Sequence, residues 1–129
     1  MGSSRVIKIV FNGVGSVLVE VKEDWNPKTV RRILESLPLS GRAMRWGDEV
    51  YFEVNLNVEE ENSRVDMEVG EVAFWPPGNA ICLFFGRTPV SVSDKPRAYS
   101  PVNPFGVIVE GIDILRKVKG GEKVTVVMG

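Results

Sequence analysis

Residues 5–22 read RVIKIVFNGVGSVLVEVK and carry the pattern of a β-hairpin. In residues 5–11, apolar side chains recur at every second position, which places them on one face of a strand. Asn12-Gly13 follows and favours a type I′ turn, in which both central residues need a positive φ. Residues 16–22 alternate in the same way after this turn. The sequence therefore predicts two antiparallel strands joined by a tight turn.

Six further segments have the apolar content and length of short strands. They are residues 42–46, 49–54, 71–75, 80–85, 107–110 and 123–128. Residues 80–85 (AICLFF) are almost wholly apolar, which is typical of a strand buried on both faces. Residues 55–66 are polar and acidic, so we expect a solvated connection there. Residues 86–105 contain four prolines and predict a long loop, a kind of segment that is usually functional.

Residues 27–37 have the apolar period of a helix, with side chains at i, i+3, i+4 and i+7 on one stripe. Asn26 is a favoured N-cap, and Pro27 fits the first helical position because its missing N–H is not needed there. Pro38 ends this helix. A second, short helix is predicted at residues 112–117 (IDILRK).

These elements predict a mainly β fold: a closed β-barrel of about eight strands with one main α-helix and one short helix. Closure is favoured because it leaves no exposed strand edges in so valine-rich a chain. The 129 residues are expected to form a single domain, residues 1–129, in which residues 1–4 are a disordered N-terminus.

The charge balance disfavours several classes of partner. The chain has 16 basic and 17 acidic residues, for a net charge of −1, whereas nucleic-acid binders usually carry a basic excess. No apolar run reaches the roughly 18 residues of a membrane helix. No apolar signal-peptide core follows the first residue. We therefore expect a cytoplasmic protein that binds neither nucleic acid nor membrane.

Histidine is absent and Cys82 is the single cysteine, which limits the available chemistry. No imidazole base, histidine-ligated zinc or Ser-His triad is possible, and no internal disulfide or thiolate cluster can form. We expect no metal and no cofactor. The apolar surroundings of Cys82 predict a buried, inert thiol. Abundant valine, glutamate and lysine, with no glutamine, favour a thermophilic prokaryotic source.

Residues 75–79 (WPPGN) are the most unusual stretch of the chain. The two prolines lack ladder N–H groups and end the preceding strand, Gly78 permits a positive φ, and Asn79 then presents an amide. One reading makes this stretch the rim of a ligand pocket with Phe74 and Trp75 as apolar walls. The other reading makes it a stiff structural turn.

Residues 45–52 (RWGDEVYF) form a second candidate region around a Gly47-Asp48 turn. Alternation places Arg45 and Trp46 on opposite faces. A functional reading puts Arg45 at a pocket mouth, whereas a structural reading puts Trp46 in the core and Arg45 in a surface ion pair. Together the two regions and the start of the long loop give the candidate ligand-binding residues. They are Arg45, Trp46, Tyr51, Phe74, Trp75, Pro77, Gly78, Asn79, Phe85 and Thr88.

Three segments resemble cyclophilins and occur in the same order. Residues 26–37 (NPKTVRRILESL) are similar to the first cyclophilin helix, and residues 105–117 (FGVIVEGIDILRK) are similar to a later strand-and-helix segment. Phe84-Phe85 matches a Gln-Phe-Phe strand. A closer resemblance is to the small prokaryotic cyclophilin-like proteins of uncharacterised function. It is carried by RWGDEVYF (45–52), GEVAFWPPGNA (70–80), FFGRTP (84–89) and SPVN (100–103). The resemblance implies a cyclophilin-like fold and no settled activity.

The departures from true cyclophilins leave the function open between two classes. In true cyclophilins an arginine after Phe-His polarises the prolyl amide, and the nearest counterpart is residues 43–45 (AMR), which makes Arg45 the candidate catalytic residue. The histidine is absent, and residues 68–71 (EVGE) replace Gln-Gly-Gly-Asp. The favoured reading is a module that binds a small molecule or peptide in the cyclophilin-type groove. The alternative is an atypical peptidyl-prolyl cis-trans isomerase with Arg45 as electrophile. The chain is expected to be a monomer or a homodimer.

Overall fold

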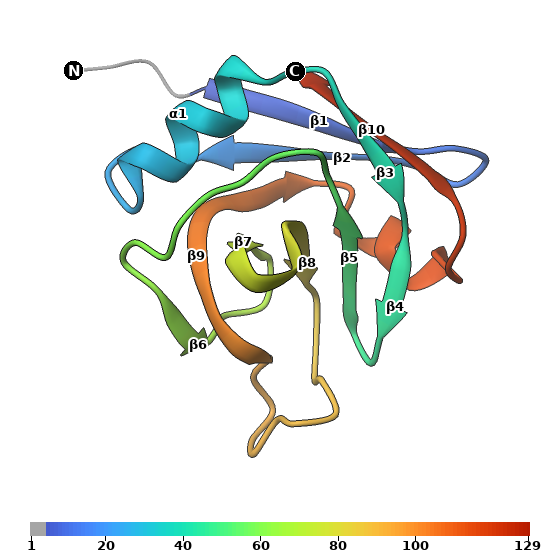
Figure 1. Cartoon of the computed structure of the whole chain (residues 1–129). Helices are drawn as coiled ribbons and strands as arrows, with labels where there is room; N and C mark the ends of the chain where they lie inside the picture. Colours follow the sequence, from blue (N-terminus) through green and yellow to red (C-terminus); the bar gives the residue numbers. More distant parts are fainter. Residues whose placement is uncertain (1–4) are drawn as a thin grey trace.

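The computed structural model describes residues 5–129, and the N-terminus predicted to be disordered, residues 1–4, lies outside the described residues. Figure 1 shows a strongly curved sheet with one α-helix beside it. The strands are β1 (Arg5–Phe11), β2 (Gly15–Val21), β3 (Leu39–Arg42), β4 (Met44–Trp46), β5 (Glu49–Glu53), β6 (Arg64–Asp66), β7 (Glu71–Trp75), β8 (Ala80–Phe84), β9 (Arg97–Glu110) and β10 (Lys123–Met128). The helices are α1 (Pro27–Glu35) and two 3₁₀ helices, η1 (Pro76–Gly78) and η2 (Ile112–Lys117).

The prediction of a mainly β fold with one main and one short helix is confirmed, but the prediction of a closed barrel of about eight strands is wrong. Within residues 5–129 there are ten strands in the order β3-β10-β1-β2-β9-β7-β8-β5-β4, with β6 paired to β9. The sheet stays open because β3 and β4, at its two ends, do not pair with each other. The two edge strands follow one another in the chain, and only Ala43 separates the end of β3 from the start of β4. The backbone of Ala43 bonds only to the β10 side, at Gly121 and Glu122.

The predicted hairpin is present, but its turn differs from the predicted type. Phe11 pairs with Gly15, so the loop contains three residues rather than two. Gly13 has a positive φ of 80°, whereas Asn12 does not. A type I′ turn would require both. The Val14 amide instead donates to the Phe11 carbonyl over 3.0 Å and closes the longer loop.

Two apolar clusters cover the two faces of the sheet, because successive side chains of a strand point to opposite faces. The main cluster fills the inside of the curved sheet and includes Phe52 on β5 and Leu83 on β8. A smaller cluster lies on the outer face and includes Cys82 and Phe84 on β8. The strand β8 is therefore buried on both faces, as its apolar sequence predicted.

The helix α1 begins at Pro27 and Asn26 occupies its N-cap position, both as predicted, but another residue supplies the capping side chain. The side chain of Asn26 makes no capping bond and is fully buried. Its Nδ2 atom donates to the Pro104 carbonyl over 2.7 Å, and its Oδ1 atom accepts from the Asn62 amide over 2.6 Å. The cap comes from Glu61, which belongs to the segment predicted as a solvated connection. Its carboxylate accepts from the first free amides of the helix.

The predicted loop at residues 86–105 is too long, because strand β9 already begins at Arg97. Figure 1 shows β9 curving from beside β2 towards β6. The prolines of β9 lie at irregular points of its ladders. Pro104 lies next to a register shift against β7, and Pro101 lies within a shift against β6. A proline is tolerated at such a point because no regular ladder bond is lost there.

Candidate functional site

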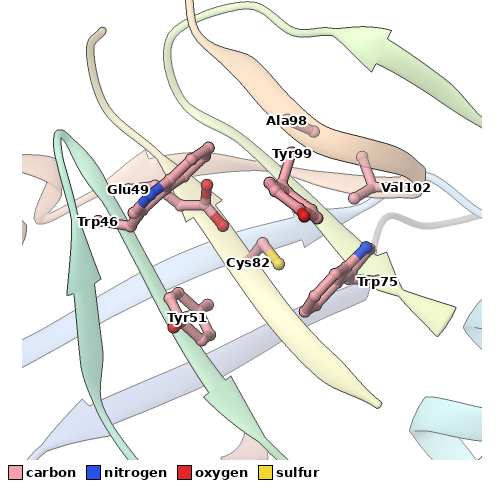
Figure 2. Close-up of a pocket in the computed structure, with 8 residues that line it drawn as sticks. All are labelled: Trp46, Glu49, Tyr51, Trp75, Cys82, Ala98, Tyr99 and Val102. Carbon is pink, nitrogen blue, oxygen red and sulfur yellow. The ribbon is translucent and has the colours of Figure 1, made fainter. Parts of the chain in front are cut away.

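A pocket of about 190 Å³ lies on the outer face of the sheet, between β4, β5, β7, β8 and β9. Figure 2 shows its eight lining residues: Trp46, Glu49, Tyr51, Trp75, Cys82, Ala98, Tyr99 and Val102. We call this site the aromatic pocket, because half of its lining residues are aromatic. Strand pairing brings four of these residues together, since Trp46 on β4 pairs with Glu49 on β5 and Tyr51 on β5 pairs with Cys82 on β8.

Three of the aromatic rings form a continuous wall. The ring of Tyr99 meets Trp46 edge-to-face at 6.1 Å between centroids, and it meets Trp75 edge-to-face at 6.0 Å. Figure 2 shows Trp75 and Trp46 on opposite sides of Cys82, with Tyr51 at the remaining side. Such edge-to-face contacts stabilise aromatic clusters beyond the area that they bury. The wall is therefore a set of mutually supporting rings.

Two contacts set the position of Trp75 in this wall. Its Nε1 atom donates to Ser100 Oγ over 2.7 Å, which ties β7 to β9. A Cβ atom added at Gly78 would lie 2.4 Å from ring atoms of Trp75. The glycine thus leaves the space in which the indole ring lies against η1.

Glu49 lies in the floor of the aromatic pocket and is buried, with 5% of its surface exposed. Desolvation by burial raises the pKa of its carboxyl group from 4.5 to about 7, and a hydrogen bond with the Cys82 thiol partly offsets this rise. Within residues 5–129 its Oε1 atom has no hydrogen-bond partner. Figure 2 shows the carboxyl group pointing into the space between Trp46, Tyr99 and Cys82.

Three other titratable side chains line the pocket with Glu49, and none of them is a lysine or an arginine. They are the Cys82 thiol from β8 and the phenols of Tyr51 and Tyr99. Burial, together with the neighbouring Glu49 carboxylate, raises the pKa of the thiol well above its usual value, so the predicted burial of Cys82 is confirmed. In the described part of the chain, no lysine or arginine lines the aromatic pocket.

The sequence-predicted residues separate into those in the pocket and those elsewhere. Trp46, Tyr51 and Trp75 line the aromatic pocket. Phe74 and Phe85 lie in the main core on the inner face of the sheet. Both rings are predicted ligand contacts, but alternation along β7, and from the end of β8 to Phe85 directly after it, turns them away from the pocket.

The candidate catalytic residue Arg45 lies outside the aromatic pocket. Its guanidinium donates to the carbonyls of Gly47 (2.7 Å) and Val118 (2.9 Å) and to Asp48 Oδ1 (3.1 Å). It also lies 4.9 Å from the centroid of the Phe85 ring. Arg45 therefore joins the β4–β5 turn to the segment that follows η2, and the alternation that separates it from Trp46 places it on the other face.

Thr88 and residues 77–79 lie outside the aromatic pocket. Thr88 is buried, and its hydroxyl donates to the Arg97 carbonyl over 2.5 Å, which holds the start of β9. Gly78 and Asn79 line a wider groove of about 770 Å³ next to the pocket, whereas Pro77 lines neither space. The positive φ predicted for Gly78 occurs instead at Asn79, at 50°.

This neighbouring groove adjoins the aromatic pocket, since Tyr51 and Trp75 line both. Its remaining lining comes from residues 53–57 and 78–80, with Arg42 and Met44. A ligand larger than the pocket could extend along this groove.

Sequence reasoning missed Glu49, Cys82, Ala98, Tyr99 and Val102 as pocket residues. A signal for Glu49 was available, because it shares one face of the predicted strand 49–54 with Tyr51. No such signal existed for Tyr99, since the prolines around it predicted a loop. Within residues 5–129, no three His, Cys, Asp or Glu side chains lie close enough to hold a metal ion. No helix of the described chain is long and apolar enough to cross a membrane.

Comparisons with known proteins identify the family. A family model described as cyclophilin-like matches residues 5–127. The chain is 45% identical to the hypothetical protein AF2241 from Archaeoglobus fulgidus, whose solution structure is similar with a TM-score of 0.85, covering 100% of this chain and 98% of that chain. A comparison with curated proteins finds no match. These matches confirm the resemblance found in the sequence, and the chain belongs to the cyclophilin-like family.

Proposed function

We propose that this protein is a ligand-binding module whose site is the aromatic pocket. The observation that carries the proposal is Glu49, a buried carboxyl group with an unpartnered oxygen inside a ring of aromatic side chains. Leaving a buried polar atom unpaired costs about 1–3 kcal/mol, so folded proteins rarely retain one without a use. A pocket with apolar walls and one polar group is the usual form of a small-ligand site.

The size of the pocket limits what it holds. Its volume of about 190 Å³ is below the roughly 300–1,000 Å³ of pockets for drug-sized ligands. A small molecule or one side chain of a peptide fits this volume. The neighbouring groove provides room for the rest of a longer ligand.

The alternative function, an isomerase with Arg45 as electrophile, draws no support from this geometry. The guanidinium of Arg45 already donates to three carbonyls and a carboxylate, and it lies outside the aromatic pocket. A group that polarises a bound amide needs free donors directed at the ligand. A module that only binds its ligand does not need Arg45 as a catalytic group.

A fragment screen by ¹⁵N–¹H NMR tests the proposed function. Fragments are expected to shift the amides of β5, β8 and β9 that surround the aromatic pocket. The variant Tyr99→Ala, which removes the Tyr99 ring, should lower the affinity of these fragments by about tenfold, since one aromatic contact contributes roughly 1–1.5 kcal/mol. Tyr99 is 72% exposed, so this variant is expected to fold.

Val109→Ala is the matched control, because Val109 is exposed on the same strand and lies outside the pocket. It should leave fragment affinity unchanged. The proposal fails if no fragment shifts the pocket amides, or if Tyr99→Ala and Val109→Ala have equal effects. Native mass spectrometry of the purified protein adds a direct search for a retained ligand.

A further inference from the structure

We propose that the ligand carries an ammonium group with at least one N–H, held between the aromatic rings and the Glu49 carboxylate. A free alkylamine and a lysine side chain of a peptide both supply this chemistry. This inference deepens the proposed function and rests on it, because it names the ligand class of the same aromatic pocket.

The rings provide the first argument. Trp46, Tyr99 and Trp75 form the edge-to-face wall described above, and Tyr51 lines the remaining side. A cation within about 6 Å of such ring faces is attracted by their quadrupoles, most strongly by tryptophan. Aromatic cages of this kind bind ammonium ligands. An anion would meet the negative faces of the same rings, so anionic ligands are disfavoured.

Glu49 provides the second, independent argument. It is the one charged residue among the described lining residues, and it is nine-tenths or more buried. Its Oε1 atom has no partner within residues 5–129, so it is available to accept a hydrogen bond from a ligand. A carboxylate out of water forms its strongest bonds with charged donors. An ammonium N–H supplies both the missing donor and the missing positive charge.

Among residues 5–129, no lysine or arginine lines this position. Arg45 is the basic residue nearest in sequence to Glu49 among those described, and its guanidinium is bonded to Asp48 on the other face of the sheet. The titratable groups that do face Glu49 are the Cys82 thiol from β8 and the two phenols, and none of them is an amine or a guanidinium. Its charge is therefore left for a ligand to neutralise.

The same arrangement predicts how affinity changes with pH. In the free protein the pKa of Glu49 is about 7, and a bound cation lowers it because the cation favours the carboxylate. Binding then releases a proton below pH 7, so affinity falls as pH falls. With a pKa of 7 in the free protein, the binding constant at pH 6 is about one-tenth of that at pH 8.

The test compares n-butylammonium with 1-butanol, its neutral analogue of similar size, by NMR titration at pH 8. Wild-type protein is expected to bind n-butylammonium about tenfold or more tightly than 1-butanol, since charge-assisted hydrogen bonds are worth about 1.5–3 kcal/mol. Glu49→Gln should abolish this preference. Glu110→Gln is the matched control, because Glu110 is an exposed glutamate of β9 that lines neither the aromatic pocket nor the groove.

A second arm distinguishes the two sources of the ammonium group. Nα-acetyl-lysine methylamide carries the same group on a peptide unit. If a peptide is the source, this probe binds more tightly than n-butylammonium and also shifts the groove amides of residues 53–57. If a free amine is the source, n-butylammonium binds at least as tightly and the groove amides do not move. Both results support the ammonium site.

The outcomes separate this inference from the proposed function. Equal binding of 1-butanol and n-butylammonium, unchanged in Glu49→Gln, would overturn the ammonium site and leave small-molecule binding intact. If neither these probes nor any screened fragment shifts the pocket amides, both proposals fail. Folding of Glu49→Gln is checked by its amide spectrum. If this variant does not fold, the affinity of the wild-type protein for n-butylammonium is measured at pH 6 and at pH 8 instead. An affinity that is equal at the two pH values overturns the inference.

Discussion

The protonation of the buried Glu49 carboxyl group is coupled to the stability of the fold. Burial raises its pKa to about 7 in the folded protein, whereas the unfolded chain exposes it with a value near 4.5. Between these values the folded state binds more protons than the unfolded state. The free energy of unfolding therefore falls as pH rises from 4.5 to 7, which is the opposite of the usual carboxylate behaviour.

We predict that Glu49→Gln removes this pH dependence. A shift of this size amounts to roughly 3 kcal/mol of unfolding free energy across the window, and glutamine does not titrate. Urea denaturation between pH 4.5 and 8 measures the effect. The wild-type protein and the exposed-site control Glu110→Gln should lose stability with rising pH, while Glu49→Gln should stay nearly constant. Parallel pH profiles for all three proteins would contradict the assigned environment of Glu49.

Two other acidic residues have shifted pKa values, but they do not change the free energy of unfolding between pH 4.5 and 7. Burial tends to raise the pKa of Glu61, but hydrogen bonds from Lys28 and Thr29 outweigh it and lower the pKa overall. The pKa of Glu122 is also lowered, chiefly by hydrogen bonds from the backbone of Lys119 and Gly120. Their stabilisation is present above pH 4.5 and is lost as pH falls below that value.

At the level of elements, helix α1 depends on a residue that is distant in sequence. The carboxylate of Glu61 accepts from the amides of Lys28 and Thr29 at 3.1 Å and from the Thr29 hydroxyl at 2.9 Å. The buried Asn103 supports this contact, since its Oδ1 accepts from the Glu61 amide and its Nδ2 donates to the same hydroxyl. The connection 55–66 is thus a structural clamp on the helix.

We predict that Glu61→Ala destabilises the protein by about 1–2 kcal/mol, the usual loss for a helix cap that also interacts with the helix dipole. Glu59→Ala is the matched control, because the exposed Glu59 contributes only its backbone carbonyl to the clamp. Urea denaturation at pH 7 compares the two variants. Equal losses in both would show that the acidic run acts by general charge and not through the observed cap.

On the scale of the whole molecule, the sheet separates the main core from the proposed binding site. Its inner face carries the main core and its outer face carries the aromatic pocket. Neighbouring residues of one strand therefore have different roles. Phe52 is fully buried and meets Phe11 edge-to-face at 6.4 Å, whereas Tyr51 is partly exposed in the pocket wall.

We predict that Phe52→Ala and Tyr51→Ala differ sharply in their effects. Phe52→Ala should reduce the free energy of unfolding by about 3–5 kcal/mol, because it leaves a cavity in the core. Tyr51→Ala should reduce it by less than about 2 kcal/mol while weakening ligands of the pocket, because its side chain is only partly removed from water. Thermal and urea unfolding measure both variants. A loss for Tyr51→Ala as large as that for Phe52→Ala would contradict this separation.

The strand pattern and the family were accessible from the sequence because both depend on local order. Alternation in residues 5–11 and 49–54 reflects which side chains leave water, and the helical period of residues 27–37 does the same. The candidates Trp46 and Tyr51 come from this alternation around the Gly47-Asp48 turn, and Trp75 comes from the unusual WPPGN stretch. Arg45 was a candidate because residues 43–45 resemble the Phe-His-Arg of true cyclophilins, and Phe85 belongs to the segment that resembles their Gln-Phe-Phe strand.

What the amino-acid order alone determined was therefore the β-rich class, the hairpin, the helices and the aromatic residues near the site. Only the tertiary structure decided that β9 runs through two prolines, that Glu61 caps α1, that the sheet stays open at Ala43 and that Glu49 is buried beside Tyr99. The physical reason is that propensity and periodicity act over a few residues. Desolvation, ring contacts and register shifts depend on which distant strands meet, and only the complete packing specifies that.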